Sequence, residues 1–217
     1  MNAIELLETQ HRDIDDLFMH LRHGGGAKER KQWFDDLADL LAIHASIEEL
    51  HFYPAVKALQ TAQILEMSTR EHLGIKRKLA ALMALDVNGE RFAERLQGLE
   101  EEVHSHVQEE RDDLFPLVKQ IMDPDVLEAL GQEMTSTMAE LQQGRPRLDV
   151  PLQTIAPMPL AELPTQGPLS SRIMPRISRL LTLPLQAIGA GRMVFDLGRS
   201  FAEGLRRGLA RNRRRHA

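Results

Sequence analysis

The sequence of 217 residues contains no cysteine. Disulfide bonds, iron–sulfur clusters and thiolate metal sites are therefore excluded, and any bound metal must use nitrogen and oxygen ligands. The chain also lacks an apolar run long enough to span a bilayer. Its first residues, "MNAIELLETQHRDIDD", are acidic and amphipathic, unlike a signal peptide. A cytoplasmic protein is expected.

Charge is distributed unevenly along the chain. Residues 1–144 contain 14 lysines and arginines against 28 acidic residues, which gives a net charge of −14. Residues 145–217 contain 13 arginines against 4 acidic residues, which gives a net charge of +9. The two parts of the chain are therefore expected to have different roles.

Apolar residues recur at intervals of three and four through most of residues 1–144. This spacing is typical of amphipathic helices packed in a bundle. Four helices are expected around residues 4–21, 33–47, 65–82 and 92–117. The loop "HGGGA" ends the first helix, and the pair Tyr53–Pro54 predicts a kink or an end in the second. The short connections favour an up-down-up-down order.

A fifth helix is expected in "DPDVLEALGQEMTSTMAELQQG", because Asp123 can cap it and Pro124 suits its first turn. The predicted fold of residues 1–144 is therefore all-α: an up-down-up-down four-helix bundle with the fifth helix packed outside it. Six prolines predict an extended linker over residues 145–168. Residues 169–217 form an arginine-rich C-terminal extension.

Four of the nine histidines occupy inner positions of the predicted helices, where a bundle normally has leucine or isoleucine. Each helix contains one of them: His11, His44, His72 and His106. The first and third are 61 residues apart, and both begin an "H-x-x-I" pattern. The second and fourth are 62 residues apart and begin the related blocks "HASIEELHFYP" and "HVQEERDDLFP". The bundle is therefore expected to contain two similar helical hairpins.

Each block places a glutamate four residues after its histidine, on the same helical face, at Glu48 and Glu110. A buried carboxylate needs a compensating cation, so two of them in one core predict a bound metal. Four imidazoles and two carboxylates suit iron best, with manganese or zinc as alternatives. Two ions fit better than one, because two carboxylates can bridge a pair of metals while each metal takes two imidazoles and keeps a position for a small ligand.

The alternative to a metal site is a structural polar core, since a single buried histidine is usually satisfied by hydrogen bonds alone. Four histidines in repeating register with two glutamates favour the metal site. His51 lies two turns after His44 and is a candidate for supporting a ligand or lining an access path. The remaining histidines are expected to be solvated: His20, His23, His104 and His216.

These motifs resemble the hemerythrin-like, HHE cation-binding domains. The resemblance covers residues 1 to about 144 and rests on His11, the two repeated blocks, "EHLGIK" around His72 and the helix "VLEALGQEM". It implies a four-helix bundle around a non-haem di-iron centre. The terminal iron ligands that it implies are His11, His44, His72 and His106, and the bridging ligands are Glu48 and Glu110.

Two positions depart from the oxygen-carrying members of this family. Lys76 occupies the place of their second third-helix histidine, and Arg111 occupies the place of their aspartate, so that Glu110 supplies the carboxylate one residue earlier. The resemblance then implies a role in nitrosative stress, iron-centre repair or sensing. The leading hypothesis is a di-iron protein that binds or reduces oxygen, nitric oxide or peroxide as sensor, scavenger or enzyme, with an electron donor that the sequence does not identify.

The alternative function is a non-catalytic iron store, donor or adaptor that acts through residues 169–217. Apolar residues lie on one helical face of this segment and arginines on another, so contact with an anionic membrane surface or a partner protein is expected. Nucleic acid is a weaker candidate, because the acidic bundle repels it and the segment has only two aromatic residues. A disordered, solubilising tail is the remaining alternative, since its glycines weaken a helix.

Overall fold

The structure is a computed structural model, and it describes residues 1–57 and 61–157. The predicted C-terminal extension, residues 169–217, and the second half of the predicted linker lie outside the described residues. Within the described residues all regular structure is helical, and no strand is present. None of the helices in this part of the chain has the length and apolar character needed to cross a membrane.

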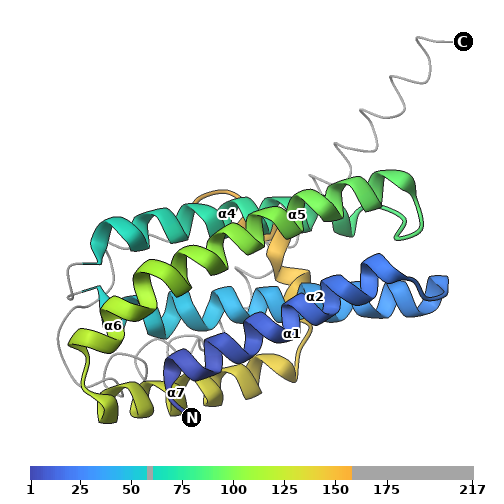
Figure 1. The fold of residues 1–217 in the computed structure, drawn as a ribbon. Helices are drawn as coiled ribbons and strands as arrows, with labels where there is room; N and C mark the ends of the chain where they lie inside the picture. The colour runs from blue at the N-terminus through green and yellow to red at the C-terminus, as the bar shows by residue number, and fades with distance from the viewer. Residues whose placement is uncertain (58–60, 158–217) are drawn as a thin grey trace, which may run out of the picture. The chain divides into compact units, whose positions relative to one another are not determined.

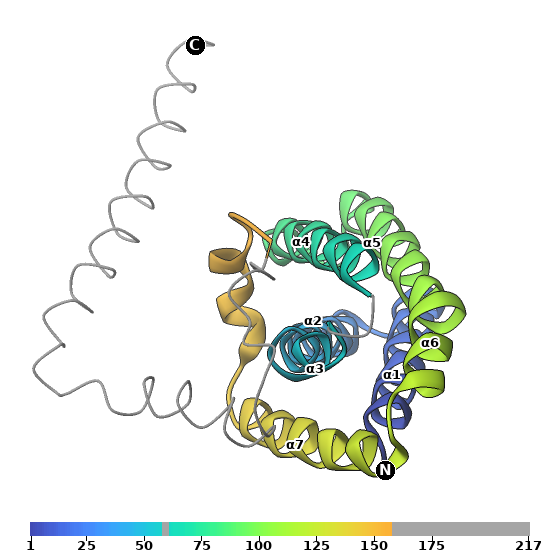
Figure 2. The same ribbon diagram turned by 90° about the vertical axis from the view of Figure 1, so that its left-hand side faces the viewer.

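Four long helices form the bundle (Figure 1). The first hairpin consists of α1 (Ala3–His23) and α2 (Ala27–Ile47), and the second consists of α4 (Ala62–Met83) and α5 (Glu90–Glu109). Figure 2, which looks along the bundle, shows these helices around a shared interior. The all-α four-helix bundle expected from the sequence is confirmed.

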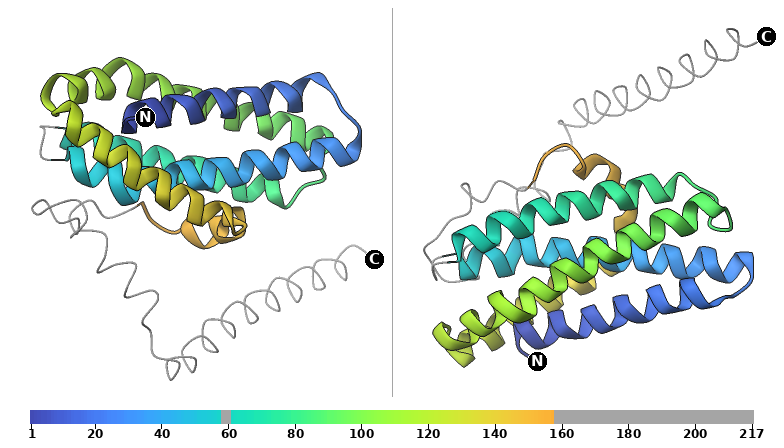
Figure 3. Two further views of the ribbon diagram at one scale, coloured as in Figure 1. Left: turned by 90° about the horizontal axis from the view of Figure 1, so that it is seen from below. Right: turned by 45° about the horizontal axis from the view of Figure 1, so that its top comes forward.

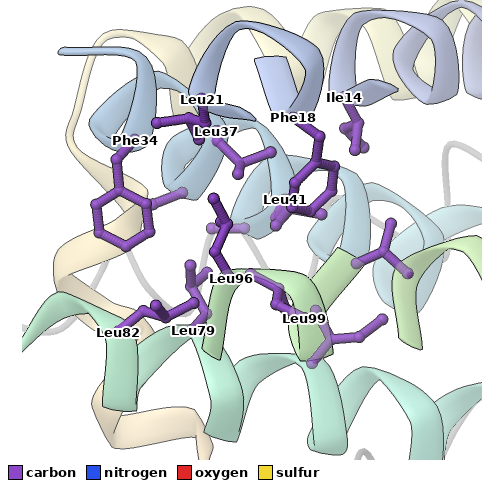
Figure 4. Packing of buried hydrophobic residues seen from close by; sticks show 14 of the residues in the cluster. Ile14, Phe18, Leu21, Phe34, Leu37, Leu41, Leu79, Leu82, Leu96 and Leu99 are labelled. Atoms are coloured by element: carbon purple, nitrogen blue, oxygen red, sulfur yellow. The ribbon is translucent and has the colours of Figure 1, made fainter. Parts of the chain in front are cut away.

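A hydrophobic cluster fills the end of the bundle that contains the loop between α1 and α2 (Figure 4). All four helices contribute to it, and its labelled members are Ile14, Phe18, Leu21, Phe34, Leu37, Leu41, Leu79, Leu82, Leu96 and Leu99. Burial of each such side chain stabilises the fold by about 1.5–3 kcal/mol. The adjoining loop requires glycine at Gly25, where φ is 92° and a Cβ would lie 2.4 Å from the Trp33 ring.

A second hydrophobic cluster forms at the opposite end, where α7 (Pro124–Gln142) packs against the outside of α1 and α2 (Figures 2 and 3). The Asp123 carboxylate accepts a hydrogen bond from the Asp125 amide at 2.8 Å and caps this helix. Gly131 allows close approach, because a Cβ there would lie 2.6 Å from the backbone of Met1 and Asn2. The predicted fifth helix and its cap are confirmed.

The second and fourth helices each widen into a π-helical turn after the repeated histidine. In both turns the amide five residues later donates to the glutamate carbonyl: Tyr53 to Glu48 and Phe115 to Glu110. The proline after each of these aromatic residues has no amide proton to donate, so it suits the end of such an irregular turn. The kink expected at Tyr53–Pro54 is thus a π-helical turn. The segments are η1 (Glu48–Phe52), α3 (Tyr53–Val56), η2 (Glu110–Leu114) and α6 (Phe115–Ile121).

The structure differs from the expected extended linker over its first half. Residues Pro146–Gln153 form a 3₁₀-helix, η3, that packs against α2 and α4. Val150 is fully buried in the first hydrophobic cluster. Arg147 forms ion pairs with Asp35, at 3.4 Å, and with Asp39. One apolar anchor and one cationic anchor therefore hold this segment on the bundle despite its prolines.

Candidate metal centre

The six predicted ligand residues lie together in the bundle interior, between the two hydrophobic clusters. None of them exposes more than 4% of its surface. Their positions are His11 in α1, His44 in α2, His72 in α4, His106 in α5, and Glu48 and Glu110 at the starts of η1 and η2. Their side chains form two overlapping groups, and within each group the candidate ligand atoms lie within 4.8 Å of one another.

The first group consists of His11, His44, Glu48 and Glu110. The Nε2 atoms of His11 and His44 are 3.3 Å apart. His11 Nε2 is also 3.3 Å from Glu110 Oε2, and His44 Nε2 is 3.3 Å from Glu48 Oε2. Two imidazoles and two carboxylates therefore face one small volume.

The second group consists of Glu48, His72 and His106. The Nε2 atoms of the two histidines are 3.1 Å apart. Glu48 Oε2 is 3.1 Å from His72 Nε2 and 4.0 Å from His106 Nε2. Glu48 thus belongs to both groups and lies between them.

Burial and neighbouring charges shift the pKa values of the two glutamates of the centre in opposite directions. Burial, followed by the charge of Glu110, raises the pKa of Glu48 well above its usual value. Burial by itself raises the pKa of Glu110, but the charges of His106, His11 and His44 outweigh it and lower that pKa. Glu48 Oε1 is buried without a hydrogen-bond partner among the described residues. This surplus of buried nitrogen and oxygen donors fits metal ions that accept N and O ligands.

Three polar residues support the histidines from outside the centre. An ionised carboxylate only accepts hydrogen bonds, so a histidine beside it carries its proton on Nδ1 and directs an Nε2 lone pair inward. Each supporting residue adjoins one ligand in sequence but contacts the ligand of a neighbouring helix. The pairs are His44 Nδ1 with Gln10 Oε1 at 3.0 Å, His72 Nδ1 with Glu49 Oε1 at 3.0 Å, and His106 Nδ1 with Glu71 Oε2 at 2.9 Å.

Tyr53 is a further member of the centre that the sequence analysis missed. Its side chain is fully buried, and its hydroxyl lies 3.2 Å from His72 Nε2. The same hydroxyl is 3.5 Å from Glu48 Oε2 and 3.5 Å from Glu110 Oε1. Burial and the nearby carboxylates raise the pKa of Tyr53, so the phenol keeps its proton and acts as a donor. The single tyrosine of the chain, inside the first repeated block, was the available signal.

The other histidines lie apart from the six. His20, His23 and His104 are exposed, and His104 Nε2 pairs with Asp15 at 3.0 Å. His51 is buried, but its Nε2 faces α7, 2.8 Å from the Thr137 hydroxyl. It therefore ties the π-helical turn to α7. His216 lies outside the described residues.

Comparisons with known proteins identify the family of the chain. A solved structure of an HHE cation-binding domain-containing protein from Mycobacterium kansasii matches with a TM-score of 0.59 and 26% identity, over 66% of this chain and 88% of that one. A curated DNA nickase from Nostoc sp. is 23% identical over 143 residues, and the chain spans only 41% of its length. The family model of the hemerythrin HHE cation binding domain matches residues 2–118, which include all six ligand candidates. The chain belongs to the hemerythrin HHE cation-binding domain family.

Proposed function

We propose that the chain is a non-haem di-iron protein that binds or reduces a small oxidant: oxygen, nitric oxide or peroxide. The observation that carries this proposal is the pair of buried ligand groups that share Glu48. Each group contains two histidines and at least one glutamate, a donor set that suits iron. Manganese and zinc are the alternatives for the same ligands.

The two ions would be held by different sets of residues. One set is His11, His44, Glu48 and Glu110, and the other is Glu48, His72 and His106. Bound iron supplies electrons and a coordination position for the oxidant. Glu110 is not in the compact second set, although its Oε2 lies 3.9 Å from His106 Nε2, so the side of His72 leaves more room for a small exogenous molecule. The proposal therefore assigns the oxidant to the side of the centre that contains His72.

Tyr53 is the proposed proton donor on that side. Its hydroxyl is 3.2 Å from His72 Nε2, within reach of a small molecule held beside this histidine. Its contacts with Glu48 and Glu110 hold the hydroxyl in place. Reduction of oxygen or peroxide consumes protons, and the buried Tyr53 hydroxyl carries one at this position.

Apolar rings around the centre support a small, uncharged substrate. Phe115 stacks on the His11 ring with centroids 6.0 Å apart, and Phe52 packs edge to face on Phe115 at 5.9 Å. Both phenylalanines are fully buried or nearly so. Such surroundings exclude bulk water and strengthen electrostatic interactions inside. Lys76 in place of a further histidine favours reduction or sensing over reversible oxygen carriage.

Metal content and ultraviolet–visible spectra of protein purified without added metal test this proposal. We expect about two irons per chain and a spectral change with oxygen, nitric oxide or peroxide. His72→Ala and Glu110→Ala should abolish both, whereas His104→Ala, at an exposed histidine, should change neither. Absence of iron, or iron that is indifferent to these two substitutions, would contradict the proposal.

DNA cleavage, after which the Nostoc relative is named, is not part of the proposal. The chain spans 41% of that protein, and the net charge of −14 on residues 1–144 repels nucleic acid. An iron store, donor or adaptor that docks on a membrane or a partner remains a prediction, because residues 169–217 lie outside the described residues. The cytoplasmic location also remains a prediction.

A further inference from the structure

The two histidines of the second ligand group both have carboxylates behind them. His72 Nδ1 is 3.0 Å from Glu49 Oε1, and His106 Nδ1 is 2.9 Å from Glu71 Oε2. Each carboxylate thus lies within hydrogen-bond distance of the Nδ1 atom of one ligand candidate, and Glu49 also forms an ion pair with Lys76.

In the part of the chain that the structure describes, the two histidines of the first ligand group, His11 and His44, have no such carboxylate behind them. His44 Nδ1 meets the neutral amide oxygen of Gln10 at 3.0 Å. The amide nitrogen of Gln10 lies 3.5 Å from the Met138 sulfur. His11 Nδ1 is buried and has no hydrogen-bond partner among the described residues. The outer surroundings of the two groups thus differ in charge.

Lys76 fixes one of the outer carboxylates in place. Its Nζ lies 2.7 Å and 2.9 Å from the two oxygens of Glu49. The lysine is 7% exposed, so this ion pair is largely shielded from solvent. Lys76 offsets part of the negative charge of Glu49. Its main effect is positional, because its two contacts hold the carboxylate against His72.

We infer that Glu49, held by Lys76, and Glu71 are positioning residues for one of the two metal ions. They orient His72 and His106 and raise the basicity of these ligands, whereas no carboxylate among residues 1–57 and 61–157 does so for His11 or His44. The affinity of the second ligand group for its metal therefore depends on outer carboxylates, and that of the first group does not. The inference rests on the proposed function, because it requires two metal positions. Outer hydrogen-bond partners of this kind typically contribute about 10–100-fold to metal affinity.

The test is an anaerobic titration of the metal-free, full-length chain with Fe²⁺ against a competing chelator, repeated with Co²⁺ to follow the ligand-field spectrum. Glu49→Gln and Glu71→Gln should each weaken the binding of one of the two ions by about 10–100-fold and leave the affinity for the other ion unchanged. Lys76→Met should weaken the binding of the same ion and shift the same cobalt bands. Lys76→Arg, which keeps the positive charge, should show the wild-type affinity and the wild-type bands. Glu102→Gln and Lys78→Met are controls, because they break a salt bridge between α4 and α5, the helices that the contact of Glu71 with His106 also joins, away from the centre.

The outcomes separate this inference from the proposed function. A wild-type chain that binds no metal contradicts the proposed function. If both glutamine variants bind two ions with unchanged affinities, the inference is overturned and the proposed function is not. Equal loss of affinity for both ions also overturns the inference alone. Circular dichroism of each metal-free variant shows whether it folds. Glu71 is less enclosed than Glu49, so Glu71→Gln provides the decision if Glu49→Gln does not fold.

Discussion

The Tyr53 hydroxyl lies 3.2 Å from His72 Nε2, although the residues are 19 positions apart and belong to different helices. The π-helical turn directly before Tyr53 ends with a hydrogen bond from the Tyr53 amide to the Glu48 carbonyl. One irregular turn therefore carries a shared ligand candidate at its start and a proton donor just after its end. π-helical turns within α-helices are frequent at functional sites.

Tyr53→Phe tests the proton donor. The substitution keeps the buried ring and removes only the hydroxyl, so about two irons per chain should still bind. Reduction of peroxide or oxygen by the reduced protein should slow by about 10²–10⁴-fold, the usual contribution of a positioned acid. Stopped-flow spectroscopy measures the rate, and iron analysis of the same sample is the control. An unchanged rate would exclude Tyr53 as the donor.

Glu48→Gln should have opposite effects on the metal-free and the metal-loaded protein. The raised pKa of Glu48 means that its folded state favours the neutral form. A group whose pKa is raised in the folded state destabilises the protein when the pH is above the pKa of that group in the unfolded state. The neutral amide should therefore raise the melting temperature of the metal-free protein at pH 7.

The same variant should lose the stabilisation that metal gives, because Glu48 belongs to both ligand groups. For the wild-type chain, free metal at about 100 times the dissociation constant raises the free energy of unfolding by about 2.7 kcal/mol for each occupied site. Differential scanning calorimetry with and without Fe²⁺ measures both effects. Equal metal-induced shifts in variant and wild type would contradict the shared position of Glu48.

His51 should make the metal-free protein sensitive to mild acid. Burial lowers the pKa of His51 to about 4 from its ordinary value of 6.5. A lowered histidine pKa favours the neutral imidazole in the folded state, so stability is lost as the pH falls from about 6.5 towards 4. The glutamine of His51→Gln can still contact Thr137. Between pH 7 and pH 5 the free energy of unfolding of this variant should fall by about 2 kcal/mol less than that of the wild type.

Urea unfolding at the two pH values measures this difference. His23→Gln, at an exposed histidine, is the control and should follow the wild type. Parallel losses in His51→Gln and wild type would show that the histidine does not titrate on unfolding.

Two glycine substitutions should change stability in opposite directions. Gly131→Ala places a methyl group 2.6 Å from the backbone of Met1 and Asn2, so α7 must move away from α1, at a cost of about 1–3 kcal/mol. Gly98→Ala meets no atom within 4 Å and should stabilise α5 by about 0.5–1 kcal/mol. Urea denaturation of both variants measures the effects. A stable Gly131→Ala protein would show that the contact between α7 and the N-terminus adapts easily.

Local sequence patterns were sufficient to predict the bundle and its polar centre. Apolar spacing located the helices, and spacing of four placed Glu48 beside His44 and Glu110 beside His106 on their helical faces. The fifth helix followed from Asp123 and Pro124. These features depend on neighbours within one helix, and sequence spacing fixes such neighbours directly.

The first half of the predicted linker shows where composition failed. Prolines in residues 146–153 suggested an extended chain, yet Val150 lies in the core and Arg147 pairs with Asp35 and Asp39 of α2. These contacts join positions more than one hundred residues apart, so no local sequence pattern predicts them.

The sequence by itself determined which residue types face the interior, and so the chemistry available there. Only the tertiary structure decided which of them support one another. Gln10, Glu49 and Glu71 each adjoin a ligand candidate on their own helix, but the imidazole that each one contacts is on the next helix. Helical spacing sets the direction of a side chain around its own axis, whereas its partner depends on the rotation and separation of two packed helices, which spacing along the chain does not specify.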